Sequence, residues 1–166
     1  MRYAYQGFHM KHNDTLSESE TTFVQRSLRN CEKKIARFYL TAKIHKTPWE
    51  TRPVVSTSGT MIAGLSKWVN HWLHKIRNLI PTYLQDTIYL LRVLWDTGKL
   101  PIEAKLFTAD ANSMYTNVNT EHGIQTIIDF LGDHLDELVH DFPIKEFKAA
   151  LRNVMTNDVF EFGDFF

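Results

Sequence analysis

Apolar residues recur every three or four positions along much of this chain, which is the period of helices that bury one face. The clearest stretch begins at Ile62 and stops at Pro81, and a second one closes at Gly98, a residue typical of helix C-terminal caps. The apolar positions are Ile62, Leu65, Val69, Trp72, Leu73, Ile76 and Ile80 in the first, and Leu84, Ile88, Leu91 and Trp95 in the second.

Three further helices follow from the same period. The first covers residues 17–37, with Ser17 and Ser19 as caps and with Phe23, Leu28, Cys31 and Ile35 near one face. The second begins at Asn119 or Thr120 and carries Ile124, Ile127, Ile128, Leu131 and Leu135. The third begins at Pro143 and directs Ile144, Phe147, Leu151 and Met155 inward.

Shorter β-prone runs predict strands. Residues 38–45 and 53–56 flank a turn, and together they predict a β-hairpin. Residues 104–109 predict another strand, and residues 159–166 alternate and then turn, which predicts one half of a second hairpin. Taken together, the elements predict a helix-rich α+β fold.

Composition narrows the class of protein. The chain has 166 residues, 43% of them hydrophobic and 13% aromatic, which is typical of a globular protein. The single cysteine, Cys31, excludes an internal disulfide and a cysteine-based zinc cluster. We expect a soluble intracellular protein, because the sequence contains neither a long apolar run nor the apolar core of a signal peptide.

The net charge of zero hides an asymmetry. Between residues 26 and 52, eight basic residues stand against two acidic ones, whereas between residues 96 and 141 nine acidic residues stand against two basic ones. Two oppositely charged solvated faces would produce this pattern. A protein that handles a polyanion also needs a basic wall and a separate acidic platform for metal ions. Charge alone does not decide between the two.

Asp110 ends the β-prone run at residues 104–109, and Tyr115 follows five positions later. Nucleotidyl transfer uses two divalent ions roughly 4 Å apart, and aspartates supply the hard oxygen ligands that Mg²⁺ prefers. Asp110 is therefore a candidate metal ligand, although an Asp at a strand end is also a common cap or turn former. Tyr115 is either a core residue or a side chain that lies under the sugar of a nucleotide.

The predicted hairpin carries the candidate phosphate contacts. Arg52 precedes Pro53, which favours an extended backbone, and its guanidinium suits bidentate phosphate binding. Lys43 lies across the turn and could assist as a mobile point charge. The alternative is a hairpin with a solvated basic face. Trp49, in the turn, either stacks on a base or packs on its own hairpin, and packing is the expectation.

Other polar and aromatic residues carry weaker signals. His71 and His74 lie three positions apart on a predicted helix without an acidic partner motif, so we expect them on the surface. Trp68 and Trp72 are expected in the core. Residues 162–165, Phe-Gly-Asp-Phe, contain only one Asp and predict a turn rather than a second metal motif.

Together these segments resemble the reverse transcriptase domain of Penelope-like retroelements, relatives of the telomerase reverse transcriptases. The resemblance covers residues 35–166 and keeps the family's order and spacing. Its motifs are FYLTAKIHK (38–46), TRPVVS (51–56), LSKWV (65–69), YLQDT (83–87) and LFTADANSMYTNV (106–118), followed by EHGI (121–124).

The resemblance implies part of a right-hand polymerase. It divides the chain into a lead-in and helix at 1–34, a fingers-like region at 35–103 and a partial palm at 104–166. It makes Asp110 the first catalytic metal ligand, Tyr115 the sugar-selecting residue and Arg52 a phosphate contact, together with Lys43 or Lys46. It also implies Mg²⁺, an RNA template, a DNA primer and dNTPs as partners of the complete enzyme, and nuclear residence. Asn112 stands where serine is common in the family.

The main departure from the family is that the template-grip segment and the Asp-Asp motif do not occur in the 166 residues. We therefore expect this chain not to polymerise DNA by itself. The alternative is a remnant of a retroelement that binds nucleic acid without chemistry. A further alternative is an ordinary helical α/β protein whose motifs match by chance.

Overall fold

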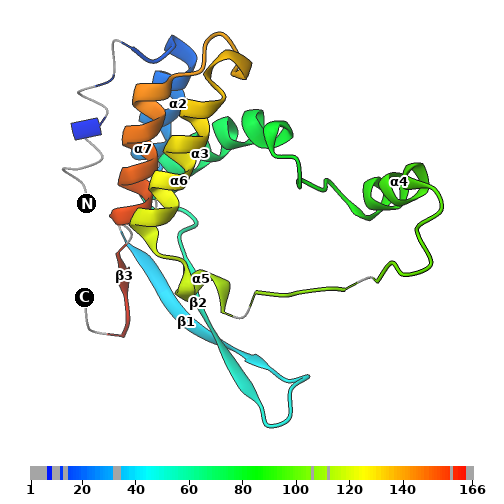
Figure 1. Ribbon diagram of the computed structural model, residues 1–166. Coiled ribbons are helices and arrows are strands. Elements are labelled where there is room, and N and C mark those ends of the chain that lie inside the picture. The colour runs from blue at the N-terminus through cyan, green and yellow to red at the C-terminus, as the bar shows by residue number, and fades with distance from the viewer. Residues whose placement is uncertain are drawn as a thin grey trace.

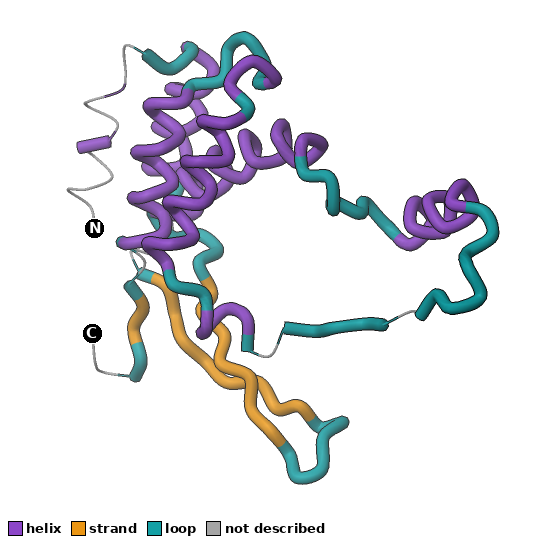
Figure 2. The backbone as a smooth tube through the Cα atoms, in the orientation of Figure 1, coloured by secondary structure: helices purple, strands orange, loops and turns teal. Residues whose placement is uncertain are grey.

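The computed structural model describes residues 7–8, 12, 15–31, 35–105, 107–111, 113–157 and 159–163. Four helices lie side by side: α2 (Glu18–Arg29), α3 (Ile62–Ile76), α6 (Thr120–Asp133) and α7 (Ile144–Thr156) (Figure 1). A β-hairpin projects from one end of this bundle (Figure 2). The predicted α+β class is confirmed.

The core lies between the four helices. Leu65, Ile124, Leu131 and Phe147 have no exposed surface, and α3 packs on both α2 and α7. Val24 is 1% exposed and belongs to the same cluster of buried residues. Residues from all three sequence-defined regions therefore contribute to one core.

The predicted stripe of α3 is confirmed. Ile62, Leu65, Val69, Trp72 and Ile76 are all buried. The helix tightens into the 3₁₀ turn η1 (Arg77–Leu79), and Ile80, beyond this turn, is 40% exposed. Trp68 and Trp72 are 3% and 6% exposed, which confirms their place in the core.

Helix α2 begins with a reciprocal cap. The Ser17 hydroxyl accepts a hydrogen bond from the Glu20 backbone N–H, and the Glu20 carboxylate accepts one from the Ser17 backbone N–H. The Ser17 hydroxyl also donates to the carboxylate over 2.6 Å. This capping box satisfies two backbone donors that a helix start leaves free.

The same carboxylate joins α2 to α3. Glu20 Oε1 accepts hydrogen bonds from the indole nitrogens of Trp68 and Trp72, over 2.8 and 3.0 Å. The two buried rings lie edge to face, with centroids 6.3 Å apart. Because a buried N–H without a partner is costly, Glu20 allows two tryptophans to pack in the core with their polar atoms satisfied.

The inward face of α2 differs from the prediction. Val24 is buried, whereas Phe23, which the apolar pattern directs inward, is 42% exposed. The helix also ends at Arg29, and strand β1 (Ala36–Lys43) begins before the predicted helix would have finished. The inward stripe is Glu20, Val24 and Leu28, and its first position is a carboxylate that a hydrophobic pattern assigns to the outside.

The small sheet has the order β2-β1-β3. Strands β1 and β2 (Glu50–Ser56) form the predicted antiparallel hairpin, in which Arg37 to Lys43 pair with all of β2. Strand β3 (Phe160–Glu161) pairs in parallel with Ala36 and Arg37 only. Phe160 and Glu161 thus extend the hairpin sheet, and the predicted turn begins at Gly163, while residues 164–166 lie outside the described part of the chain.

The predicted strand at residues 104–109 is wrong for the described residues. Ala104, Lys105 and residues 107–109 form no strand, and they are exposed. Leu106 lies outside the described residues. A strand requires a partner for its backbone groups, and none of the described strands pairs with this segment.

Helix α4 (Thr87–Thr97) follows its predicted signals but buries no side chain. Asp86 caps it by accepting from the Tyr89 N–H, and Gly98 ends it with φ at 71°. Trp95 is 86% exposed, and the helix stands away from the bundle at the end of extended connections (Figures 1 and 2). Its apolar positions are therefore uncovered.

The C-terminal helices agree with the prediction in most positions. Asn119 caps α6 by accepting from the His122 N–H, and Ile124 and Leu131 are buried. In α7, Phe147 and Leu151 are buried, but Met155 is 42% exposed. Leu135 lies beyond α6 in the 3₁₀ turn η2 (Leu135–Glu137), where it is 53% exposed. Among the described residues, no helix has both the length and the apolar character needed to cross a bilayer.

Two opposing effects act on the pKa of the Glu20 carboxyl. Burial raises the pKa of this carboxyl, but hydrogen bonds from Ser17, Trp68 and Trp72 outweigh burial and hold the pKa below its usual value. We expect Glu20→Ala to lower the free energy of unfolding by about 2 kcal/mol more than Glu18→Ala does. Both variants remove a negative charge from the first turn of α2, but only Glu20→Ala leaves two buried indole N–H groups without a hydrogen-bond acceptor. Urea unfolding monitored by circular dichroism measures this difference.

The lowered pKa also sets the sign of the pH dependence. The stabilisation by Glu20 is present above the pKa of the unfolded chain and is lost as pH falls through the lower folded-state pKa. The difference between wild type and Glu20→Ala should therefore shrink below about pH 4.5. A difference that stays constant down to pH 2.5 or so would contradict this assignment.

Candidate functional site

The hairpin presents two different faces. Across the antiparallel pair, Thr41 lies opposite Arg52 and Lys43 lies opposite Glu50. Because side chains alternate along a strand and directly opposed residues share a face, all four side chains belong to one polar face. The opposite face carries apolar residues such as Phe38 and Leu40, and the Phe38 ring stacks on Phe160 at 5.5 Å between centroids.

Lys43 is engaged within the hairpin. Its Nζ donates to Glu50 Oε2 over 3.0 Å. The hydrogen bond and the charge of Lys43, with smaller contributions from Lys46 and His45, lower the pKa of Glu50. A lysine that already neutralises a carboxylate offers less charge to an outside anion.

Lys46 and Arg52 are not engaged in this way. Both are exposed, and the structure gives neither of them an ion pair with another described residue. Lys46 lies in the turn, where its backbone N–H bonds to the Lys43 carbonyl over 3.1 Å. The sequence does not distinguish Lys43 from Lys46 as a phosphate contact. The structure does, because only the Lys43 ammonium is bound by a described carboxylate.

Trp49 does not pack on its own hairpin. Its side chain is 75% exposed, and Ile44 on the other side of the turn is 73% exposed. The expectation of a packed turn tryptophan is therefore wrong. The tip of the hairpin combines an open indole face with the exposed cation of Lys46.

Asp110 is exposed in the segment 107–111, which has no regular structure. The structure gives it no hydrogen bond or ion pair with another described residue. Tyr115 lies in the short helix α5 (Met114–Asn117), but its side chain is outside the described part of the chain, as are Asn112 and Asp164. The predicted site residues Asp110 and Arg52 thus stand on different elements, with no described contact between them.

The described residues do not fit a two-metal centre. No group of three or more His, Cys, Asp or Glu side chains among them is placed to hold a metal ion. His71 and His74 are exposed, as expected for surface positions, and the His74 ring bonds to Arg77 over 3.1 Å. Within the described part of the predicted site, Asp110 is therefore the single candidate ligand for Mg²⁺.

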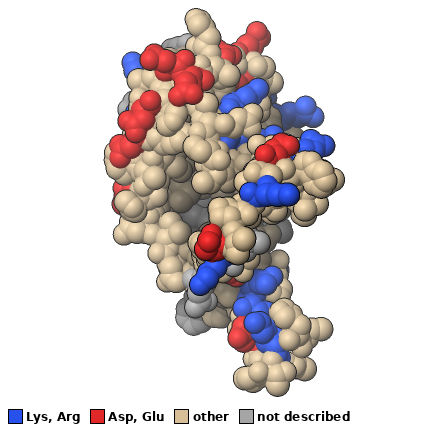
Figure 3. Space-filling view, turned by 45° about the vertical axis from the view of Figure 1, so that its right-hand side comes forward, with Lys and Arg blue, Asp and Glu red and all other residues tan. Residues whose placement is uncertain are grey.

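The charge asymmetry of the sequence is visible on the surface. Figure 3 shows Lys and Arg side chains on the projecting lower part of this face and Asp and Glu side chains gathered at the upper end. Lys and Arg side chains also lie on the right of the upper part, and acidic side chains also occur on the lower part, so the two signs are only partly separated.

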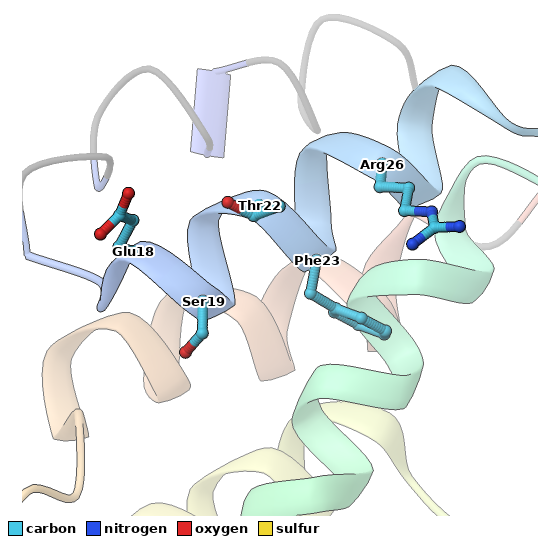
Figure 4. Close-up of a pocket in the computed structure, with 5 residues that line it drawn as sticks. All are labelled: Glu18, Ser19, Thr22, Phe23 and Arg26. Carbon is cyan, nitrogen blue, oxygen red and sulfur yellow. The ribbon is translucent and has the colours of Figure 1, made fainter.

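Sequence reasoning missed a groove along α2. Figure 4 shows its first part, lined by Glu18, Ser19, Thr22, Phe23 and Arg26, with Phe23 and Arg26 reaching toward α3. The signal was present in the sequence: once Val24 faces inward, Phe23 must stand at the edge of the helix interface. The hydrophobic period alone assigned Phe23 to the core.

A scan against protein-family models, a search of curated proteins and a search of solved structures each found no match to this chain.

The exposure of the tryptophans is testable by fluorescence. Trp49 and Trp95 are 75% and 86% exposed, whereas Trp68 and Trp72 are buried. Acrylamide should quench the emission of the first pair readily and that of the second pair poorly. In a Trp49→Phe/Trp95→Phe variant, the readily quenched fraction should disappear; if it persists, one of the α3 indoles is open to solvent.

Proposed function

We propose that this chain is the fingers region and the first part of the palm of an RNA-directed DNA polymerase similar to the reverse transcriptases of Penelope-like retroelements. The observation that carries the proposal is the hairpin. Motifs 38–46 and 51–56 fold into one projecting element on which the cations of Lys46 and Arg52 are exposed. The ordered motif set of the sequence supports the same assignment.

In this proposal the hairpin binds phosphates. Arg52 contacts the phosphates of the incoming nucleotide, and Lys46 is the assisting lysine, because Lys43 is held by Glu50 over 3.0 Å. Asp110 is the first metal ligand and Tyr115 the residue that selects the sugar. Template RNA, primer DNA, dNTPs and Mg²⁺ belong to the complete enzyme.

Residues 1–166 are not proposed to extend a primer. They contain no Asp-Asp pair, and no group of three or more His, Cys, Asp or Glu side chains among the described residues is placed to hold a metal ion. One carboxylate cannot hold two ions in register for an in-line displacement. The activity assigned to the chain itself is therefore binding.

A binding module without catalysis is the second candidate. Its supporting observation is the contrast between the two halves of the site: the hairpin cations are exposed on a regular element, whereas Asp110 lies in an irregular segment. Both candidates predict salt-dependent binding of nucleic acid by the hairpin. They differ in the consequence of replacing Asp110.

Binding is tested with a labelled single-stranded RNA by fluorescence anisotropy at several salt concentrations. For Lys46→Ala/Arg52→Ala, the slope of log K against log salt should fall by about 1.4, which is roughly 0.7 for each phosphate that these two side chains neutralise. Lys43→Ala should change the slope less than Lys46→Ala does. Lys145→Ala/Lys148→Ala removes two cations from α7 and serves as the control; an equal effect of the two pairs would contradict hairpin binding.

The catalytic assignment is tested in a chimaera in which residues 1–166 continue into the template-grip and Asp-Asp segments of a Penelope-like reverse transcriptase. Asp110→Asn should reduce primer extension by at least roughly 10³-fold, because essential groups of a concerted site act as a unit. Asp129→Asn on the exposed side of α6 is the matched control. If an active chimaera still extends the primer after Asp110→Asn, the catalytic role of Asp110 is wrong and the binding module remains as the proposal.

A further inference from the structure

The groove between α2 and α3 has a second part that differs from the first in charge. This part has a volume of about 360 Å³, within the roughly 300–1,000 Å³ typical of ligand sites. It shares Phe23 and Arg26 with the part drawn in Figure 4 and reaches Lys67 on α3. The two parts thus adjoin at Phe23 and Arg26.

The charged side chains that line this second part are basic. Arg26 projects from α2 and Lys67 from α3, and no Asp or Glu among the described residues lines it. Neither cation forms an ion pair with another described residue. Uncompensated cations on two opposing walls favour an anion between them.

The remaining lining favours a nucleotide unit over a bare anion. Phe23 is 42% exposed and lies at the junction of the two parts, so its ring is open for stacking. Ser27 and Asn30 add polar groups on the α2 wall. Aromatic rings beside cations are the combination by which proteins hold single strands: a base stacks on the ring and the cations neutralise the backbone.

The groove also has a suitable place in the fold. Gly59 and Thr60, which lie between the end of β2 and the start of α3, line it. The hairpin that carries the exposed cations and the groove are thus connected through one short segment. A single strand bound at the hairpin could continue along this segment to α2.

We propose that this groove binds a nucleotide unit of single-stranded RNA, with its phosphate between Arg26 and Lys67 and its base on Phe23. The proposal rests on the proposed function in taking nucleic acid as the ligand. It adds a second contact region outside the hairpin, the metal ligand and the sugar-selecting residue.

Cys31 supplies a probe inside the groove. It is the only cysteine of the chain, it lines the groove, and it is partly buried, with its thiol donating to the Leu28 carbonyl over 3.1 Å. Its rate of reaction with DTNB can be measured with and without a 12-nucleotide single-stranded RNA. Bound RNA should slow this reaction several-fold in the wild-type chain.

Two double variants distinguish RNA binding in the groove from RNA binding at the hairpin. Arg26→Ala/Lys67→Ala should abolish the protection of Cys31 and lower the salt slope of RNA binding by about 1.4. Arg29→Ala/Lys75→Ala removes one cation from each of the same two helices outside this part of the groove and should preserve the protection. Circular dichroism checks the fold, which should survive because Arg26 and Lys67 are exposed.

Stacking on Phe23 has its own test. Phe23→Leu should weaken binding of the RNA by about 10-fold and should have no effect on an abasic oligonucleotide of the same length. Equal effects on both oligonucleotides would overturn the stacking contact and with it the nucleotide as occupant.

The remaining outcomes are distinguishable. RNA binding that depends on Lys46 and Arg52 but leaves Cys31 unprotected would overturn the groove while the proposed function stands. Absence of any RNA binding would overturn both. Protection of Cys31 by a poly-glutamate peptide but not by RNA would overturn the nucleic-acid occupant and identify the groove as a site for acidic protein segments.

Discussion

The Glu20 carboxylate is the interaction on which the arrangement of the bundle depends. One oxygen accepts from Trp68 and Trp72 on α3, and the other accepts from Ser17 at the start of α2. A single group therefore caps one helix and satisfies the polar atoms of two core tryptophans on another. It determines which face of α2 turns inward, and for that reason it also determines which residues line the groove on the outside.

The elements that the sequence predicts well are those whose signals are local. The hairpin follows from two β-prone runs around a turn, and α3 follows from a stripe of apolar residues that is buried over most of its length. The caps at Asn119 and Gly98 act on the backbone within three residues. None of these signals requires knowledge of a distant partner.

The wrong predictions concern features that depend on residues distant in the sequence. The hydrophobic period directs Phe23 inward because it carries no information about the two indoles on α3 that bond to Glu20. The strand at residues 104–109 failed because strand formation depends on an adjacent strand more than on intrinsic propensity. The candidate site has the same limitation: Arg52 and its hairpin were predictable, whereas the position of Asp110 relative to them depends on the irregular segment that follows α4.

The order β2-β1-β3 leaves the sheet with two unequal margins. The outer margin of β2 contains Pro53, which has no N–H to offer, whereas β3 covers only Ala36 and Arg37 on the other side of β1. Beyond Arg37, the backbone groups of β1 on that side have no strand among the described residues to pair with. An additional strand would therefore pair better with the free edge of β1, where every backbone donor and acceptor is available. At the edge of β2, Pro53 offers no N–H and interrupts the row of donors.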